Sequence, residues 1–237
     1  MYFSPLEQFT VIPLSNQFFI TNIILYVILI VILVMLLFSL FTNLIHNSWT
    51  LLLETVIISL KKTVKEQSGN EIFLPLIMSL FSIILIGNLV SNVPYNFSIA
   101  TSLFFSITLS FIVFLGVTFY GIYLHRLKFL SFFLPIGTPL LLIPILVLIE
   151  LISYFCRSIS LGVRAFANSV AGHTLINILS GFLLSFIKSG LLITILSLIP
   201  FTLFFALIGL EIAISFIQSY VFVVLTSSYI KDVTQLH

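Results

Sequence analysis

The sequence predicts an all-α integral membrane protein. Five membrane-spanning helices and one interfacial amphipathic helix are expected, and the last two spans form a long, strongly tilted hairpin. Of the 237 residues, 60% are hydrophobic and only 7% are charged, against about 25% charged in soluble domains. The mean hydropathy is +1.31, and several apolar runs reach the roughly 20 residues that cross a bilayer core. We expect residues 1–237 to form a single membrane domain.

Composition also excludes several functional classes. The net charge is only +2 and no basic stripe alternates with aromatic residues, which argues against nucleic acid as a partner. Cys156 is the only cysteine, so the chain has no intramolecular disulfide and no thiol metal cluster. We therefore expect a lipid bilayer as the surroundings, with no metal and no cofactor.

The first part of the chain contains one span and one helix of a different kind. Residues 1–17 contain both polar and apolar residues and lack the basic start and cleavage site of a secretory signal. The sequence leaves open a short removable leader before Ser4. Residues 18–44 carry no charge and form the first span. In Ser48–Gln67, apolar residues recur at three- and four-residue spacing with lysines on the other side, which predicts an amphipathic helix in the membrane interface. A surface helix of a soluble lobe is less favoured, because no other segment could complete such a lobe.

A helical hairpin is expected over residues 72–123. Ile72–Val93 is the second span, with Asn70 as its N-cap, and Ser98–Tyr123 is the third. Leu124–Pro139 contains two prolines and a glycine and predicts a loop.

The distribution of basic residues gives the orientation. With five spans, six basic residues fall on one side of the membrane and Lys188 alone on the other, which places the C-terminus on the positive side. The six are Lys61, Lys62, Lys65, Arg126, Lys128 and Lys231.

Two runs, Leu140–Ile187 and Leu191–Ile230, are too long for a single perpendicular span. Forty helical residues extend about 60 Å, roughly twice the hydrocarbon thickness. Each run is either two short spans or one tilted helix. Neither has a strong turn signal near its middle, so residues 140–230 predict two long tilted helices that turn at Lys188–Gly190.

Polar residues form one stripe on each of these long helices. Glu150, Arg157 and Arg164 are spaced by seven residues, so they share one helix face. Ser160 and Asn168 lie on or near that face, as the spacing also predicts. The facing stripe on the second helix consists of Glu211, Ser215 and Gln218.

An antiparallel hairpin brings the two stripes into register. The pairs Arg164 with Gln218 and His173 with Glu211 have midpoints at positions 191 and 192. Both midpoints fall at the turn that Lys188–Gly190 predicts independently. We therefore expect Arg164 opposite Gln218 and His173 opposite Glu211.

Structural roles compete with functional ones for most of these side chains. For Ser160, Asn168 and Ser215, hydrogen bonds that hold helices together explain the polar side chain as well as a role in function does. Arg157 fits a structural pair with Glu150, or a side chain that reaches the interface, as well as a direct role. His173 by itself would favour a satisfied interhelical histidine.

Arg164 is different, because it lies some two dozen residues into its run. A charge at mid-membrane costs at least about 2.5 to 3.5 kcal/mol, and no residue in the register neutralises it. Its counter-charge is therefore expected on another chain.

These residues match a known family. One segment resembles the signature of subunit a of F-type ATP synthases. It is Ser160–Asn168, which reads S-L-G-V-R-A-F-A-N, followed by Ala171-Gly172-His173. Glu211 with Gln218 resembles the motif of that family's last helix, and Gly87-Asn88-Leu89 is similar to a motif of an earlier one. The pairing of His173 with Glu211 resembles the mitochondrial branch, and the opening Ser4–Phe9 looks like fungal members. Ala165 departs from the pattern, where a larger apolar residue is more usual.

The resemblance implies a non-catalytic, proton-conducting stator subunit. Arg164 would face a ring of c subunits and block leakage between two offset half-channels. Glu211 and His173 would line the channel from the intermembrane space, and Glu150, with Arg157, the exit toward the matrix. Gln218 would hydrogen-bond or space the arginine. Further implied partners are the peripheral stalk and other membrane subunits. The resemblance places the chain in the mitochondrial inner membrane, with its N-terminus in the intermembrane space and its C-terminus in the matrix.

Three other classes explain the sequence less well. A proton-coupled transporter predicts internal repeats, and none is convincing here. A haem-carrying subunit needs facing histidine pairs, whereas the four histidines lie mostly in loops or near the ends of the chain. A passive scaffold would not need Arg164.

Overall fold

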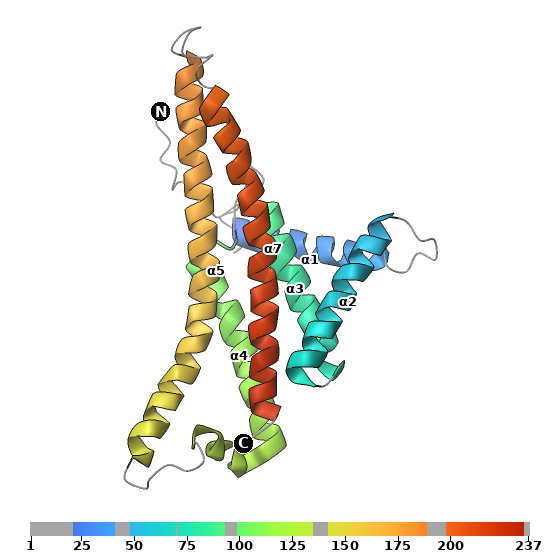
Figure 1. Ribbon diagram of the computed structural model, residues 1–237, viewed down its shortest axis with the longest axis vertical. Helices are drawn as coiled ribbons and strands as arrows, with labels where there is room; N and C mark the ends of the chain where they lie inside the picture. Colours follow the sequence, from blue (N-terminus) through green and yellow to red (C-terminus); the bar gives the residue numbers. More distant parts are fainter. Residues whose placement is uncertain are drawn as a thin grey trace. The chain divides into compact units, whose positions relative to one another are not determined.

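A computed structural model describes residues 21–40, 48–69, 71–92, 99–134, 142–188 and 198–234 (Figure 1). This part of the chain is helical, and five of its helices are long and apolar enough to cross a membrane. The prediction of an all-α membrane protein with five spans is confirmed. The spans are α1 (Asn22–Leu40), α3 (Leu74–Ser91) with the short 3-10 helix η2 (Glu71–Phe73) before it, α4 (Leu103–His125), α5 (Ile143–Lys188) and α7 (Leu198–Thr234).

The described part of each overlong run forms a single helix. In Figure 1, α5 runs unbroken from yellow to orange over 46 residues, and α7, in orange and red, is unbroken over 37. Pro144 and Pro200 lie in the first turns of these helices, where the missing proline N–H breaks no helical hydrogen bond. The interpretation of each run as one helix rather than two is therefore confirmed. The expected turn starts where α5 ends at Lys188, and its two remaining residues, Ser189 and Gly190, lie outside the described part.

The predicted amphipathic helix is present as α2 (Ser48–Ser68). On its apolar side Leu60 and Val64 are fully buried, while Lys61 and Lys65 are exposed. Both lysines form ion pairs with Glu71 of η2, at 3.2 and 3.7 Å, so α2 is tied to the start of the second span. Its location in a membrane interface stays a prediction. Asn70, the expected N-cap, lies outside the described residues.

The loop predicted over Leu124–Pro139 is wrong in its first half. Helix α4 continues to His125, and a 3-10 helix, η3, follows over Arg126–Phe133. Arg126 has a φ of 49°, which ends α4 because a left-handed residue cannot continue a right-handed helix. Phe129 and Phe133 are both buried, with ring centroids 6.0 Å apart. Burial of these two rings orders a segment that the sequence predicted to be part of a loop.

The chain divides into two compact units, and α3, α5 and α7 each contribute one segment to both. The first unit contains the described residues within 1–39, 82–102 and 165–219. The second contains those within 40–81, 103–164 and 220–237. The expectation of a single membrane domain stays a prediction.

Small residues let α4 and α5 approach closely in the second unit. Ser106, Ser110 and Ser158 are buried, and the Ser158 hydroxyl donates to the Ser110 carbonyl at 3.3 Å. A Cβ added at Gly162 would lie 2.9 Å from the Ser106 carbonyl oxygen and 3.0 Å from Ile107 Cα. This is the small-residue packing that joins helices in membranes.

Candidate functional site

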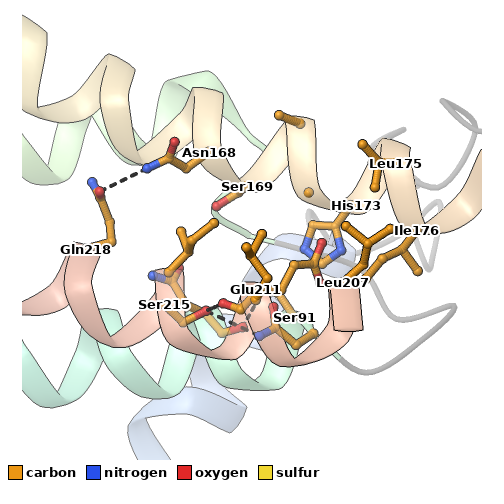
Figure 2. A pocket seen from close by; sticks show the side chains of 16 residues that line it. Ser91, Asn168, Ser169, His173, Leu175, Ile176, Leu207, Glu211, Ser215 and Gln218 are labelled. Atoms are coloured by element: carbon orange, nitrogen blue, oxygen red, sulfur yellow. Dashed lines mark hydrogen bonds between the residues drawn. The ribbon is translucent and has the colours of Figure 1, made fainter. Parts of the chain in front are cut away.

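A cavity of about 210 Å³ lies in the first unit among α3, α5 and α7 (Figure 2). Hydrogen-bonding side chains from all three helices line it. These are Asn88, Ser91, Asn92, Asn168, Ser169, His173, Glu211, Ser215 and Gln218. Their amides and hydroxyls both donate and accept hydrogen bonds, and the volume holds several water molecules.

Glu211 is the central residue of this cavity. It is buried, with 8% of its surface exposed, and neither carboxyl oxygen has a hydrogen-bond partner in the described part of the chain. Its carboxyl group lies directly against Gly172 of α5, where any side chain would collide with Oε1. Burying a polar group without a partner is costly, which indicates a role for this carboxyl beyond holding the helices together.

His173 lines the same cavity from the neighbouring helix. It follows Gly172 on α5 and is half-buried. Figure 2 shows His173 and Glu211 projecting from their two helices into the same space. The structure thus brings together the imidazole and the carboxyl that the hairpin register places opposite each other. Both groups bind and release protons.

A row of hydrogen bonds continues along the cavity from Glu211. The Ser215 hydroxyl donates to the Glu211 carbonyl oxygen at 2.9 Å, and the Asn92 amide donates to the Ser215 hydroxyl at 3.2 Å. Further along, the Asn168 amide donates to Gln218 Oε1 at 3.1 Å (Figure 2). Asn168, one member of the polar stripe expected on α5, therefore meets the stripe of α7 here, with Gln218 as its observed partner.

The contribution of α3 to the cavity was not predicted. Ser91 and Asn92 lie three and four residues after Asn88, so all three point to one side at the end of α3, which Asn92 directly follows. A polar face on an otherwise apolar span was the available signal. The sequence does not show which other helix that face meets.

A second polar cluster lies in the second unit. Arg157 forms an ion pair with Asp232 of α7 at 3.2 Å, and its guanidinium lies 5.5 Å from the ring centroid of Tyr229. Sequence reasoning offered Glu150 as a structural partner, and that alternative is wrong. Two helical turns separate Glu150 from Arg157 by about 10.5 Å along the axis, whereas Asp232 approaches from a different helix. The position of Asp232 after the apolar part of α7 gave no hint of this contact.

The remaining predicted residues also lie in the second unit. Arg164 and Ser160 are exposed and Glu150 is half-buried. No acidic side chain described in this unit forms an ion pair with Arg164. Gln218 belongs to the first unit, so its expected position opposite Arg164 stays a prediction.

Among the described residues, no three histidine, cysteine, aspartate or glutamate side chains are grouped so that they could hold an ion.

A multi-span helical protein with a buried carboxyl, an imidazole and several amides around one cavity belongs to the class of membrane proteins that handle ions or protons. Comparison with known proteins defines the family. The model of the family described as ATP synthase A chain matches residues 19–231, and this chain belongs to that family.

Curated relatives match over nearly their whole length. "ATP synthase subunit a" of Mycosarcoma maydis is 51% identical, over 99% of this chain and 98% of the relative. The protein of the same name from Vanderwaltozyma polyspora is 44% identical over the full length of both chains. A third, from Emericella nidulans, is 42% identical over 99% of this chain and 97% of the relative.

Proposed function

We propose that this chain is the proton-conducting stator subunit of the membrane sector of an ATP synthase. In this function it forms two offset half-channels that load and unload protons on the carboxylates of a c-subunit ring. The observation that carries the proposal is Glu211, a buried carboxyl with no hydrogen-bond partner in the described chain, facing a cavity of hydrogen-bonding side chains.

The cavity of the first unit serves as the half-channel from the intermembrane space. Water molecules in it can accept hydrogen bonds from Asn92 and Asn168 and donate them to the Glu211 carboxylate. A proton that arrives on the water chain binds this carboxylate, and the carboxyl later releases it to the next acceptor. His173 supplies a second proton-binding group on the opposite wall.

Arg164 separates the two half-channels in this proposal. Its guanidinium stays protonated at any usable pH, so it neither takes up nor releases a proton. The side chain is exposed and has no ion pair within its unit, and a carboxylate of the ring supplies the missing charge. Arg164 favours the ionised form of each passing carboxylate and prevents a proton from crossing directly.

The charged cluster of the second unit lines the exit toward the matrix. It includes Arg157 and Asp232, with Glu150 seven residues before Arg157 on the same helix. We place the protein in the mitochondrial inner membrane, its N-terminus in the intermembrane space and its C-terminus in the matrix, because most basic residues then face the matrix. The c ring, the peripheral stalk and other membrane subunits are its partners.

The test is proton-driven ATP synthesis by the reconstituted complex. Arg164→Ala should abolish synthesis while the complex still assembles, because each proton that leaks across 100 mV dissipates about 2.3 kcal/mol. Glu211→Gln should slow proton flux without opening a leak. Lys188→Ala, which removes an exposed cation from the same helix as Arg164, is the matched control. Normal synthesis by the Arg164→Ala complex would refute the mechanism, and unchanged flux with Glu211→Gln would remove Glu211 from the path.

A further inference from the structure

The second unit contains another hollow, of about 390 Å³, that the proposed function does not use. Its walls come from η2, α3, α4 and the C-terminal part of α7 and are almost entirely apolar. The serine that lines it, Ser79, has its hydroxyl bonded to the Leu76 carbonyl of its own helix at 2.7 Å. The volume is that of a ligand pocket, roughly 300 to 1,000 Å³, and the Tyr120 hydroxyl is the other polar side-chain group among the lining residues.

Glycine keeps this hollow open. A Cβ at Gly116 would meet no atom within 4 Å, so the missing side chain leaves space rather than allowing another helix to approach. Gly121, on the same helix, has the opposite role. A Cβ there would touch Val233 and would lie 2.7 Å from the Phe129 ring. The void beside Gly116 is therefore a local feature and not a general property of the glycines of α4.

The rim of the hollow lies close to a basic cluster. The Phe73 ring closes one side against Tyr120, with centroids 5.1 Å apart in a T-shaped arrangement. Two residues before Phe73, Glu71 pairs with Lys61 and Lys65 of α2. The ammonium groups of both lysines remain accessible, because their side chains are 50% and 70% exposed.

Lysines outnumber carboxylates between residues 61 and 71. Three exposed lysines of α2, the third being Lys62, stand against the carboxylates of Glu66 and Glu71. An amphipathic helix of this kind places its lysines at the level of lipid headgroups. An apolar hollow next to such a helix offers the two features of a phospholipid-binding site. The hollow can hold an acyl chain, and the lysines can bind the phosphate.

We propose that the hollow beside Gly116 holds one acyl chain of an anionic phospholipid, whose phosphate lies against the lysines of α2. The inference rests on the chain's position in a membrane and not on the proton path. A bound lipid would fill the space that the side chains leave between α3 and α4 and would hold α2 against the start of the second span.

The experiment uses the intact ATP synthase complex containing this chain, reconstituted in phosphatidylcholine vesicles. A small proportion of phosphatidylglycerol with a diazirine in one acyl chain is added, and labelled peptides are mapped by mass spectrometry. We expect labels on the walls of the hollow, at Ile112 and Tyr120. Gly116→Leu should reduce labelling at these residues about tenfold. The leucine side chain displaces methylene groups of the acyl chain from the hollow, and the loss of two buried methylene groups lowers the affinity by about that factor. Gly181→Leu is the control, since a Cβ at Gly181 also meets nothing within 4 Å.

Competition on the unmodified complex tests the headgroup separately and needs no variant. Unlabelled phosphatidylglycerol should suppress labelling, whereas phosphatidylcholine at the same concentration should not. Replacing the three α2 lysines by glutamine should remove this difference. Labels that persist in Gly116→Leu, equal competition by the two lipids, or cross-links from the hollow to another subunit in place of lipid would each overturn the proposal.

Discussion

Replacing Gly172 by alanine should displace the Glu211 carboxyl without disrupting the fold. The new methyl group would collide with Glu211 Oε1 and would lie 3.1 and 3.2 Å from its Cδ and Cγ atoms. Ordinary contacts begin at about 3.4 Å, so these carbon atoms must move by a few tenths of an ångström and the oxygen must move further. The obstructed group is the end of a flexible side chain, so the carboxyl can rotate away while the backbones of α5 and α7 stay in place.

The effect on stability should therefore be small and the effect on conduction large. Alanine is the better helix former, by about 0.8 to 1.0 kcal/mol in a helix interior, which offsets part of the crowding. Misplacement of a reacting group by about 1 Å can reduce a rate on the order of a hundredfold. The Glu211 Cδ and Cγ atoms need to move by only a few tenths of an ångström, so we expect a smaller fall in proton flux, of about tenfold.

The assay is passive proton flux through the reconstituted membrane sector, measured together with the amount of assembled complex. Gly181→Ala is the matched control, because it lies on the same helix and a Cβ there meets nothing within 4 Å. If Gly172→Ala assembled normally and conducted at the rate of the control, the position of the Glu211 carboxyl would not limit proton transfer, and the proposed entry channel would be refuted.

Two further variants separate packing from conduction. Gly162→Ala should lower the free energy of unfolding by about 1 to 3 kcal/mol and so lower the melting temperature of the complex, because the methyl group meets backbone atoms of α4 that cannot move away. Gly209→Ala, which meets nothing within 4 Å, should not change that stability, and equal melting temperatures would contradict the close helix contact. Asp232→Asn should change stability by no more than about 1 kcal/mol, since both members of its ion pair are about 40% exposed, yet it should lower proton flux. Flux equal to that of the unmodified complex would restrict Asp232 to a structural role.

Helix periodicity explains how much of the cavity could be predicted from the sequence. A polar residue on an apolar helix has a definite face, because position along the chain sets its rotation. Spacing alone therefore indicates that Glu211, Ser215 and Gln218 form one stripe. The hairpin turn then determines which residues of the other helix lie at the same height, and His173 and Glu211 line one cavity in the structure.

Side-chain partners between segments far apart in the chain could not be predicted in this way. Asn92, which directly follows α3, reaches Ser215, and Arg157 pairs with Asp232 rather than with Glu150. Such contacts depend on the rotation and separation of packed helices to within one or two ångströms. Sequence spacing does not fix these quantities at that precision.

The sequence by itself determined that this chain is a bundle of membrane helices with charge at a few positions, because apolar length, periodicity and the unfavourable burial of charge are local properties. It also singled out Arg164, because no residue that the hairpin register places near it carries a negative charge. Only the tertiary structure decided that α3 completes the cavity around Glu211, that Gly172 makes room for the carboxyl and that Gly116 leaves a hollow open. The reason is physical: a missing side chain can either let two groups approach or leave a void, and the outcome depends on what the rest of the fold places opposite it.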